Sequence, residues 1–562
     1  MNRTIWTCWF QGQDAAPAVV KKCMDTWERK NPDWAFRCLD ATTIERYVPL
    51  RQYVDLDRQS ITAASLSDIV RILLLHEFGG VWVDATVLCN RPLDEWLPDV
   101  MGEEFFAFAD PAPDRPLSSW FLSSESGNYL LSAWCRRTID YWSNRASSDD
   151  YFWFHHLFRE ACATERRAGE AWSRVPKVSA AGPHALQAEG FLFRPATEVI
   201  PLIDLATPVF KLTHRLPEEA SKPGGILAFL LTGYDDENGE QEGTPQLIQA
   251  TPGVEAPKSF ASLSVSTENL GDHIQIIAGL RLLAGLGVTP TRFVDRDNEI
   301  RSVPTLDDLD GPVGILLNGW FKTNREEWPP HPKLAPIIDG LHIRPFQCPE
   351  LVSDESIAFF RSHEPIGCRD VYTRDLLRSK GVETFISNCL SLTLPRRLDD
   401  AAAQTEVFVA SRDERIRDYL PKSIGPYAFV SHYSGSTDFA ANVTLAKALL
   451  QTYRSRAKLI ITTLLHCALP AIAMGIPVVV FYPMNDESAH ASDLERFSGL
   501  DGLVRVHAFE EIDSVDWNPK PIDIGTTKRE SLDRFYELTA RWQLAPRPAL
   551  GPIAPPSLLP AP

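Results

Sequence analysis

The sequence predicts an α/β protein of several folding units. From residue 259 onward, short apolar runs of strand type alternate with amphipathic helical stretches, the pattern of a parallel α/β sheet. The clearest example is RAKLIITTLLHCALPAIAMGIPVVVF, residues 456–481, which reads as strand, helix and strand. Hydrophobic residues make up 44% and charged residues 23% of the chain, an ordinary globular composition. At roughly 100–200 residues per domain, the 562 residues predict about three or four folding units.

Composition also indicates where these units begin and end. Residues 1–220 hold eleven of the fifteen tryptophans and form one aromatic-rich block. Residues 221–258 are rich in glycine, proline and acidic side chains, which predicts a linker or a long excursion. Residues 259–545 carry the α/β pattern, in two halves of about 259–395 and 400–545.

Charge, cysteine content and hydropathy exclude several classes of protein. The net charge of -18 argues against a nucleic-acid partner, which needs a basic surface. The ten cysteines include no CxxC pair and no zinc-type spacing, so buried reduced thiols are expected. Neither a membrane span nor a signal peptide is expected, which favours a cytoplasmic protein. The proline-rich tail, residues 546–562, is expected to be disordered or loosely packed.

The first candidate site lies in SLSDIVRILLLHEFGGVWVDATVLC, residues 65–89. Apolar residues recur there at helical spacing, and Gly79 or Gly80 is predicted to end the helix. Asp68 and Arg71 are three residues apart, so they share one face of the helix and can pair. A semi-buried ion pair is the ordinary explanation of two such residues.

Asp84 ends the strand that follows this helix. In open α/β sheets, ligands bind outside the carboxyl ends of the strands. A carboxylate in that place can hold Mg²⁺ or Mn²⁺, which bind oxygen ligands and bridge to phosphates. Such a cation would neutralise the diphosphate leaving group of a nucleotide-sugar.

The string SDIVRILLLHEFGGVWVDAT resembles the core of the capsular polysaccharide synthesis glycosyltransferases, which are related to the DXD sugar-transferases. IWTCWFQGQDAAPAVVKKCMDTWERKNPDW, AAGPHAL and TPVFKLTHR resemble further segments of these enzymes, in the same order. The resemblance covers about residues 1–220 and implies a GT-A-like, Rossmann-like fold. It also implies sugar transfer from a nucleotide-sugar donor to a polysaccharide or lipid-linked glycan acceptor.

The resemblance assigns roles to individual residues of this chain. Asp68 and Arg71 match the aspartate and arginine that bind the nucleotide-sugar in the resembling enzymes. Trp6 and Gln11 would line the base pocket, with plain core and turn positions as the equally weighted alternative. Asp84 is the catalytic candidate.

The metal site departs from the DXD pattern, because the second aspartate position holds Thr86. A threonine hydroxyl is a poorer metal ligand than a carboxylate. Two alternatives stay open. Another residue, for which His214 is the candidate, completes a Mn²⁺ or Mg²⁺ shell with Asp84 and Thr86, or Asp84 acts on the ribose and the metal is weakly held.

The second half, about residues 259–545, resembles the polysaccharide pyruvyl transferases. Four segments carry the resemblance in order: ENLGDHIQIIAGLRLLAGLG, PIGCRDVYTRDLLRSKGVE, NCLSLTL and LIITTLLHCALPAIAMGIPVVVF. The resemblance implies a GT-B-like pair of doubly wound α/β subdomains. It also implies transfer of an enolpyruvyl unit from phosphoenolpyruvate to a sugar, as a ketal.

Arg369 and His466 match the arginine and histidine of that family and are the catalytic candidates of this half. The loop at the start of the first helix suits an anion and supplies the binding candidates Asn269, Gly271 and Asp272. A second family arginine is replaced by Leu464. Loss of a guanidinium costs an anion site a few kcal/mol, so another transfer reaction, or a histidine with a purely structural role, stays open.

Together the two halves predict a bifunctional, bacterial-type enzyme of capsular or surface polysaccharide synthesis. Two modules on one chain would meet one acceptor at high effective concentration. In the alternative, the second half is a noncatalytic glycan-binding or assembly module, and in a broader alternative the whole chain is a scaffold. Peripheral association with a membrane assembly complex is expected, at the inner face where surface glycans are built.

Overall fold

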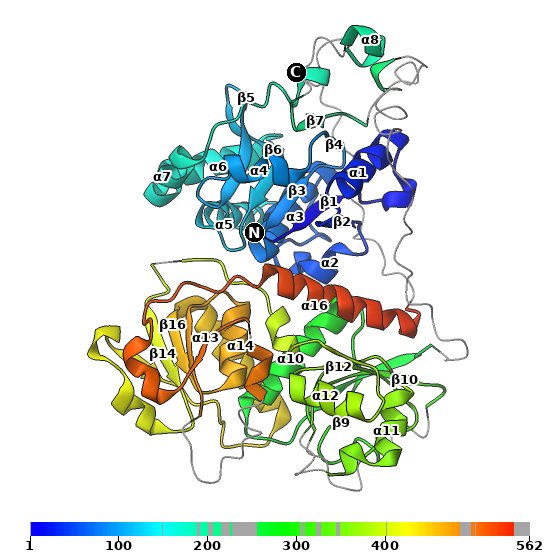
Figure 1. Cartoon of the computed structure of the whole chain (residues 1–562), viewed down its shortest axis with the longest axis vertical. Helices are drawn as coiled ribbons and strands as arrows, with labels where there is room; N and C mark the ends of the chain where they lie inside the picture. The colour runs from blue at the N-terminus through cyan, green and yellow to red at the C-terminus, as the bar shows by residue number, and fades with distance from the viewer. Residues whose placement is uncertain are drawn as a thin grey trace. The chain divides into compact units, whose positions relative to one another are not determined.

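In the computed structural model, the described residues are 2–148, 150–187, 191–199, 206–214, 225–227, 256–303, 306, 309–321, 328–343, 349–400, 402–483, 496–500 and 502–544. The chain forms two compact units, Met1–Pro245 and Gln246–Ala545, and each is described by itself (Figure 1). The predicted tail at 546–562 and most of the predicted linker at 221–258 lie outside the described residues. The predicted domain boundaries remain predictions.

The first unit is built on a five-stranded mixed sheet of order β2-β1-β3-β6-β5. Three strands run parallel, and they are β1 (Thr4–Cys8), β2 (Ala35–Leu39) and β3 (Gly80–Val83). Two strands pair antiparallel beside β3, and they are β6 (Arg115–Ser124) and β5 (Phe105–Ala112). This sheet confirms the predicted α/β class for the N-terminal half, and its parallel part brings the carboxyl ends of β1 and β3 to one edge.

The helix α3 (Ala63–Phe78) confirms the predicted helix and its ending. The Thr62 hydroxyl accepts a hydrogen bond from the Ser65 N–H at the first turn. Gly79 ends the helix with a φ of 69°, a conformation that glycine adopts without strain. The described part of this unit also contains α1 (Ala18–Lys30), α2 (Ile44–Tyr47), α4 (Leu97–Val100), α5 (Tyr129–Ser143), α6 (Trp153–Thr164), α7 (Arg166–Arg174) and α8 (Ala196–Val199).

A separate two-stranded sheet pairs segments that lie far apart in the sequence. β4 (Val87–Cys89) runs antiparallel to β7 (Val209–Lys211). The Leu212 N–H also donates to the carbonyl of Thr86, at 2.8 Å. This pairing lays the predicted closing segment against the residues that follow β3.

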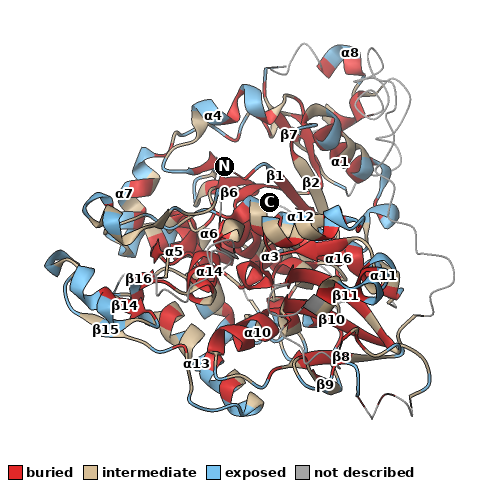
Figure 2. Cartoon of the chain, turned by 60° about the horizontal axis from the view of Figure 1, so that its bottom comes forward, coloured by how far each residue is buried: buried red, intermediate tan, exposed pale blue. Residues whose placement is uncertain are grey.

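Aromatic side chains fill the core of the first unit, as the aromatic-rich block predicts. Around the sheet, tryptophan and phenylalanine rings pack edge-on and tilted, with centroids 5.1–6.3 Å apart among Trp27, Trp96, Phe106, Phe108 and Phe121. Rings of this size bury a large apolar area each. Figure 2 shows the central strands of the unit as buried.

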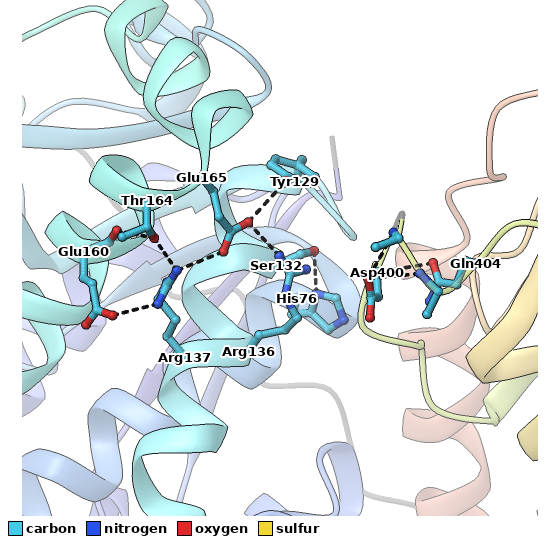
Figure 3. A network of polar contacts seen from close by, with 12 residues as sticks. His76, Tyr129, Ser132, Arg136, Arg137, Glu160, Thr164, Glu165, Asp400 and Gln404 are labelled. Carbon is cyan, nitrogen blue, oxygen red and sulfur yellow. Dashed lines mark hydrogen bonds and ion pairs between the residues drawn. The ribbon is translucent and has the colours of Figure 1, made fainter.

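Ion pairs fasten α5 to the segment between α6 and α7. Glu165 accepts hydrogen bonds from three side chains of α5, and these are Tyr129, Arg136 and Arg137 (Figure 3). One turn along α5 from Tyr129, the Ser132 hydroxyl lies 3.2 Å from Nδ1 of His76 on α3. The contacts hold α5 in place behind the helix that carries the first candidate site.

The second unit contains two parallel sheets. The first has the order β13-β12-β11-β10-β8-β9 and comprises β8 (Ser259–Ser264), β9 (Arg292–Asp295), β10 (Val313–Trp320), β11 (Leu334–His342), β12 (Ile366–Cys368) and β13 (Thr384–Ile386). The second has the order β15-β14-β16-β17-β18 and comprises β14 (Glu406–Ala410), β15 (Tyr427–Phe429), β16 (Ala457–Thr462), β17 (Val478–Phe481) and β18 (Val506–His507). The two sheets confirm the predicted pair of α/β halves.

Each sheet has a topological switch point, where the chain order of the strands reverses. It lies between β8 and β10 in the first sheet and between β14 and β16 in the second. Open α/β sheets bind ligands at such points, outside the carboxyl ends of the strands. The helices described here are α10 (Leu270–Gly285), α11 (Asp354–Arg361), α12 (Val371–Ser379), α13 (Phe439–Arg456), α14 (Leu465–Ala473) and α16 (Gly525–Leu538).

Among the residues that the structure describes, no helix combines the length and the apolar composition needed to cross a bilayer. The nine described cysteines are free thiols, as expected from their spacing.

Gly80 opens β3, and its backbone lies against the backbone of β1. Its φ is 98°, and a Cβ at this position would lie 2.5 Å from the carbonyl oxygen of Thr4. Gly12 provides a control in the same unit, because its φ is also positive, at 86°, while the nearest atom to a Cβ would lie 4.0 Å away.

We expect Gly80→Ala to destabilise the first unit by about 3 kcal/mol or more, since it adds a backbone clash to the strain of a positive φ. Gly12→Ala carries the strain alone and should cost about 1–2 kcal/mol. Urea unfolding followed by tryptophan fluorescence measures both. Equal losses in the two variants would contradict the close approach of β1 and β3.

Candidate functional site

Asp84 is the first residue after β3, at the carboxyl edge of the parallel strands. Its N–H donates to the carbonyl of Trp120 on β6, at 2.9 Å, and its own carbonyl accepts from Val87 at the same distance. The side chain is 26% exposed, so the carboxylate is partly open to solvent. This confirms the predicted strand end and leaves Asp84 accessible to a ligand.

Arg71 joins the two predicted acidic residues of the site. Its Nη2 lies 3.3 Å from Oδ1 of Asp68 and 3.1 Å from Oδ1 of Asp84. The Arg71 side chain is only 5% exposed, and its Nη1 donates to the carbonyl of Ser119. The predicted pairing of Asp68 with Arg71 is therefore confirmed, and the structure brings Asp84 to the same guanidinium.

Lys211 is a residue of this cluster that the sequence analysis missed. Its Nζ lies 3.3 Å from Oδ2 of Asp84 and donates to Oγ1 of Thr86 at 2.5 Å. The pairing of Val87 with Lys211 across β4 and β7 positions it there. The signal in the sequence is a single lysine inside the apolar segment TPVFKL.

The two carboxyls on Arg71 have opposite pKa shifts. Burial raises the pKa of Asp68 to about 7, because desolvation outweighs the attraction of Arg71 and the charge of Asp84 adds to the rise. Burial also acts to raise the pKa of Asp84, but Arg71 and Lys211 outweigh it and lower the pKa to about 2. Asp84 is therefore ionised at any physiological pH, whereas Asp68 changes charge near neutrality.

The remaining predicted residues of this half lie in different surroundings. Trp6 is fully buried, and its Nε1 donates to the carbonyl of Gly79 at 3.0 Å, which favours the core alternative over the base pocket. Gln11 is exposed in the turn after β1. His214 is exposed, and its ring lies 5.4 Å from the ring of Trp9.

The described side chains do not fit a divalent cation held by Asp84, Thr86 and His214. Both oxygens of Asp84 contact donors, since Oδ1 lies 3.1 Å from both Arg71 and Trp82 and Oδ2 lies 3.3 Å from Lys211. Thr86 accepts from the same lysine. Mg²⁺ and Mn²⁺ need several free oxygen ligands. The described residues also contain no group of three or more His, Cys, Asp or Glu side chains arranged for a metal.

In the second unit, the structure brings the two predicted catalytic residues together. Arg369 follows β12 in the first half and His466 lies in the first turn of α14 in the second half. Nη1 of Arg369 lies 3.5 Å from Nε2 of His466. The residue Arg369 is 3% exposed, and its Nε has no hydrogen-bond partner among the described residues. A buried guanidinium with an open donor is a group that an anion can satisfy.

The predicted anion loop lies at the start of α10, beside His466. Asn269 caps the helix by accepting from the Gly271 N–H at 3.1 Å. A Cβ on Gly271 would lie 2.8 Å from Cβ of His466, so only glycine allows this approach. The side chain of Asp272 is 8% exposed and lies 3.8 Å from Arg296, which the sequence analysis did not single out.

Gln275 is a second residue that the sequence analysis missed. Its Nε2 donates to Oδ1 of Asp272 at 3.2 Å and lies 3.5 Å from Nδ1 of His466. The contacts connect the start of α10 to the histidine. Leu464 occupies the N-cap of α14, where no side-chain hydrogen bond caps the helix, and it supplies no positive charge in place of the family's arginine.

Hydrogen bonds join the two halves of the second unit next to Arg369 and His466. Leu270 N–H donates to the carbonyl of His432 at 2.9 Å, and Ser434 N–H donates to the carbonyl of Glu268 at 3.0 Å. The Asn442 amide donates to the carbonyl of Thr267 at 3.1 Å. The loop after β8 is thus bonded to the loop after β15 and to α13, which fixes Arg369 and His466 against one another.

Asp68 predicts a pH dependence of stability with a definite sign. The folded state binds its proton more tightly than the unfolded chain, since the pKa rises from 3.8 to about 7. Stability is therefore lost as the pH rises from about 4 to about 7, at up to ~1.4 kcal/mol per pH unit. We expect Asp68→Asn to remove this loss. The free energy of unfolding of the variant, minus that of the native chain, should therefore increase as the pH rises from about 4 to about 7.

Urea midpoints at intervals from pH 4 to pH 8 measure the effect, with Asp57→Asn as the control, because Asp57 is exposed and pairs only at the surface with Arg51. Parallel pH profiles for the native chain and Asp68→Asn would contradict the raised pKa.

Comparison with known families separates the same two parts of the chain. Residues 1–229 match the family described as capsular polysaccharide synthesis protein. Residues 269–485 match the family described as polysaccharide pyruvyl transferase.

Curated relatives match parts of the chain. The glycosyltransferase afumC of Aspergillus fumigatus is 29% identical over 104 residues, which are 16% of this chain and 27% of that protein. The O-glycosyltransferase PaGT of Phomopsis amygdali is 26% identical over 168 residues, which are 26% of this chain and 41% of that protein. The chain therefore spans less than half the length of each of these two relatives.

A solved structure, the PaToxG glycosyltransferase, is 14% identical and covers 31% of this chain and 74% of its own, with a TM-score of 0.21. A likeness this slight says nothing about function. The family matches agree with the order of motifs and with the two units of the structure. The chain joins a domain of the capsular polysaccharide synthesis family to a domain of the polysaccharide pyruvyl transferase family.

Proposed function

We propose that the first unit transfers a sugar from a nucleoside-diphosphate sugar to a hydroxyl of a polysaccharide or lipid-linked glycan. The observation that carries the proposal is the cluster of Asp84, Arg71 and Lys211 at the carboxyl edge of β3. A permanently ionised, partly exposed carboxylate accepts hydrogen bonds from the hydroxyls of a ribose or a donor sugar. The family match and the glycosyltransferase relatives support this class of reaction.

Each residue of the cluster has a separate task in this proposal. Asp84 contacts the donor, and Arg71 fixes the orientation of the Asp84 carboxylate through a contact of 3.1 Å. Asp68 contacts the same guanidinium from the helix side and holds it in place. The predicted Mn²⁺ or Mg²⁺ remains a prediction, and no step here depends on it.

We also propose that the second unit transfers an enolpyruvyl group from phosphoenolpyruvate to a sugar. The open Nε donor of the buried Arg369, beside His466, supports an anionic donor. In the reaction, the methylene carbon gains a proton, two sugar oxygens bond to the central carbon, and phosphate leaves with the C–O bonding electrons. One of the two hydroxyl protons goes to the methylene carbon, which becomes a methyl group, and the other goes to the phosphate. The alternative, a noncatalytic glycan-binding module, is favoured by the loss of charge at Leu464.

A lipid-linked acceptor would bring the protein to a membrane surface. Peripheral association with a membrane assembly complex is part of this proposal, and flotation with purified membranes that recovers none of the protein would count against it.

For the first unit, we expect a nucleoside-diphosphate sugar to raise the thermal stability of the native chain and not that of Asp84→Asn. A ligand at a hundredfold excess over its Kd stabilises by ~2.7 kcal/mol, which is readily measured. A thermal-shift series with UDP-glucose, GDP-mannose and dTDP-glucose makes the comparison. Asp94→Asn is the control, because Asp94 is half exposed and pairs with Arg3 outside the cluster. A shift of equal size in Asp84→Asn would contradict the assignment.

For the second unit, we expect phosphoenolpyruvate to bind the native chain and to bind Arg369→Ala at least tenfold more weakly, since a charge-assisted hydrogen bond contributes about 1.5–3 kcal/mol. Arg374→Ala is the matched control, because Arg374 lies five residues further on and pairs with Asp375 on α12. Isothermal titration gives the Kd values. Absence of binding by the native chain would instead support the noncatalytic module.

A further inference from the structure

Lys211 contributes a positive charge beside Asp84 and Thr86, the two positions that match the aspartates of the DXD pattern. The position of the second aspartate holds Thr86, and the lysine ammonium sits between the two residues, 3.3 Å from Asp84 and 2.5 Å from Thr86. The Lys211 side chain is 17% exposed, so the ammonium is partly covered and still reachable. A fixed positive charge therefore already lies beside the carboxylate that was expected to bind a metal.

A divalent cation and this ammonium compete for the same oxygens. A cation bound to Oδ2 of Asp84 would lie within a few ångströms of Nζ of Lys211, and like charges at that distance repel strongly where water is partly excluded. The other oxygen of Asp84 is occupied by Arg71 and Trp82, both at 3.1 Å. A threonine adds no negative charge to offset a second cation.

We propose that the Lys211 ammonium supplies the positive charge for the diphosphate of the donor, and that donor binding and sugar transfer in the first unit need no divalent cation. The inference rests on the proposed glycosyl transfer and adds the group that stabilises its leaving group. Asp84 and Thr86 hold the ammonium in place by accepting its hydrogen bonds. Nζ has three N–H donors, so it can contact a phosphate oxygen and keep both.

The bonds, the proton and the charge of the transfer step can all be accounted for without a metal. The bond between the anomeric carbon and the β-phosphate oxygen breaks, and its electron pair stays on the leaving nucleoside diphosphate. The acceptor oxygen bonds to the anomeric carbon and loses its proton to the diphosphate or to solvent. Lys211 stays protonated and offsets the charge that develops on the leaving phosphate, as cationic side chains do in other phosphate sites.

The first test is binding of UDP, GDP and dTDP to the full chain by isothermal titration, in EDTA and in Mn²⁺. We expect at least one of them to bind in EDTA with a Kd within about threefold of the value in Mn²⁺. Lys211→Ala should weaken that binding by roughly 10- to 100-fold, the loss expected for one charge-assisted hydrogen bond. Lys211→Arg should retain most of it.

Two controls separate a contact with phosphate from a loss of structure. Lys22→Ala is matched in exposure, because the Lys22 side chain is also 17% exposed and pairs with Asp25 on α1. Lys211→Ala should leave the affinity for the corresponding nucleoside, which has no phosphate, unchanged. A damaged fold would weaken both ligands alike, and such a result would overturn the assignment to phosphate.

A double variant tests the same idea by restoring the acidic motif. Thr86→Asp combined with Lys211→Ala places a second carboxylate next to Asp84 and removes the ammonium. We expect its nucleoside-diphosphate binding to require Mn²⁺, with a loss of tenfold or more in EDTA.

The outcomes also separate this inference from the function on which it rests. If the native chain binds a nucleoside diphosphate only with Mn²⁺, and Lys211→Ala binds as tightly, the inference is overturned while the proposed transferase stands. If the native chain binds none of the three under either condition, both are overturned.

Discussion

The first candidate site depends on one buried guanidinium. The Arg71 side chain comes from α3, is 5% exposed, and contacts Asp68, Asp84 and the carbonyl of Ser119. A buried charge is costly unless its partners satisfy it, and here these partners come from a helix, a strand end and a neighbouring strand. Arg71 therefore sets the position of the Asp84 carboxylate, and removal of that carboxylate would leave the buried guanidinium without its main compensating charge.

The parts of both sites that follow from local spacing could be predicted from the sequence. Asp68 and Arg71 pair because residues three apart share a helix face, and Asp84 lies at the ligand edge because a glycine pair and a short strand precede it. Arg369 and His466 were expected in one site from the order of their motifs, and they lie 3.5 Å apart.

The parts that depend on long-range pairing could not be predicted. Lys211 reaches Asp84 through two strands of three residues each, separated by more than a hundred residues, and strands so short carry no periodicity to recognise. Gln275 reaches His466 from another half of the second unit. Trp6 illustrates a different limit, since a tryptophan in a first strand fits a core and a base pocket equally well until its burial is known.

The contact between Gly271 and His466 has a consequence for how such chains can vary. A side chain at residue 271 would lie 2.8 Å from Cβ of His466, across the boundary between the two halves. Any residue larger than glycine at 271 would push the histidine away from Arg369 or force the halves apart. Residue 271 and the histidine are therefore sterically coupled, and a side chain at 271 becomes tolerable only where the histidine no longer has to face Arg369.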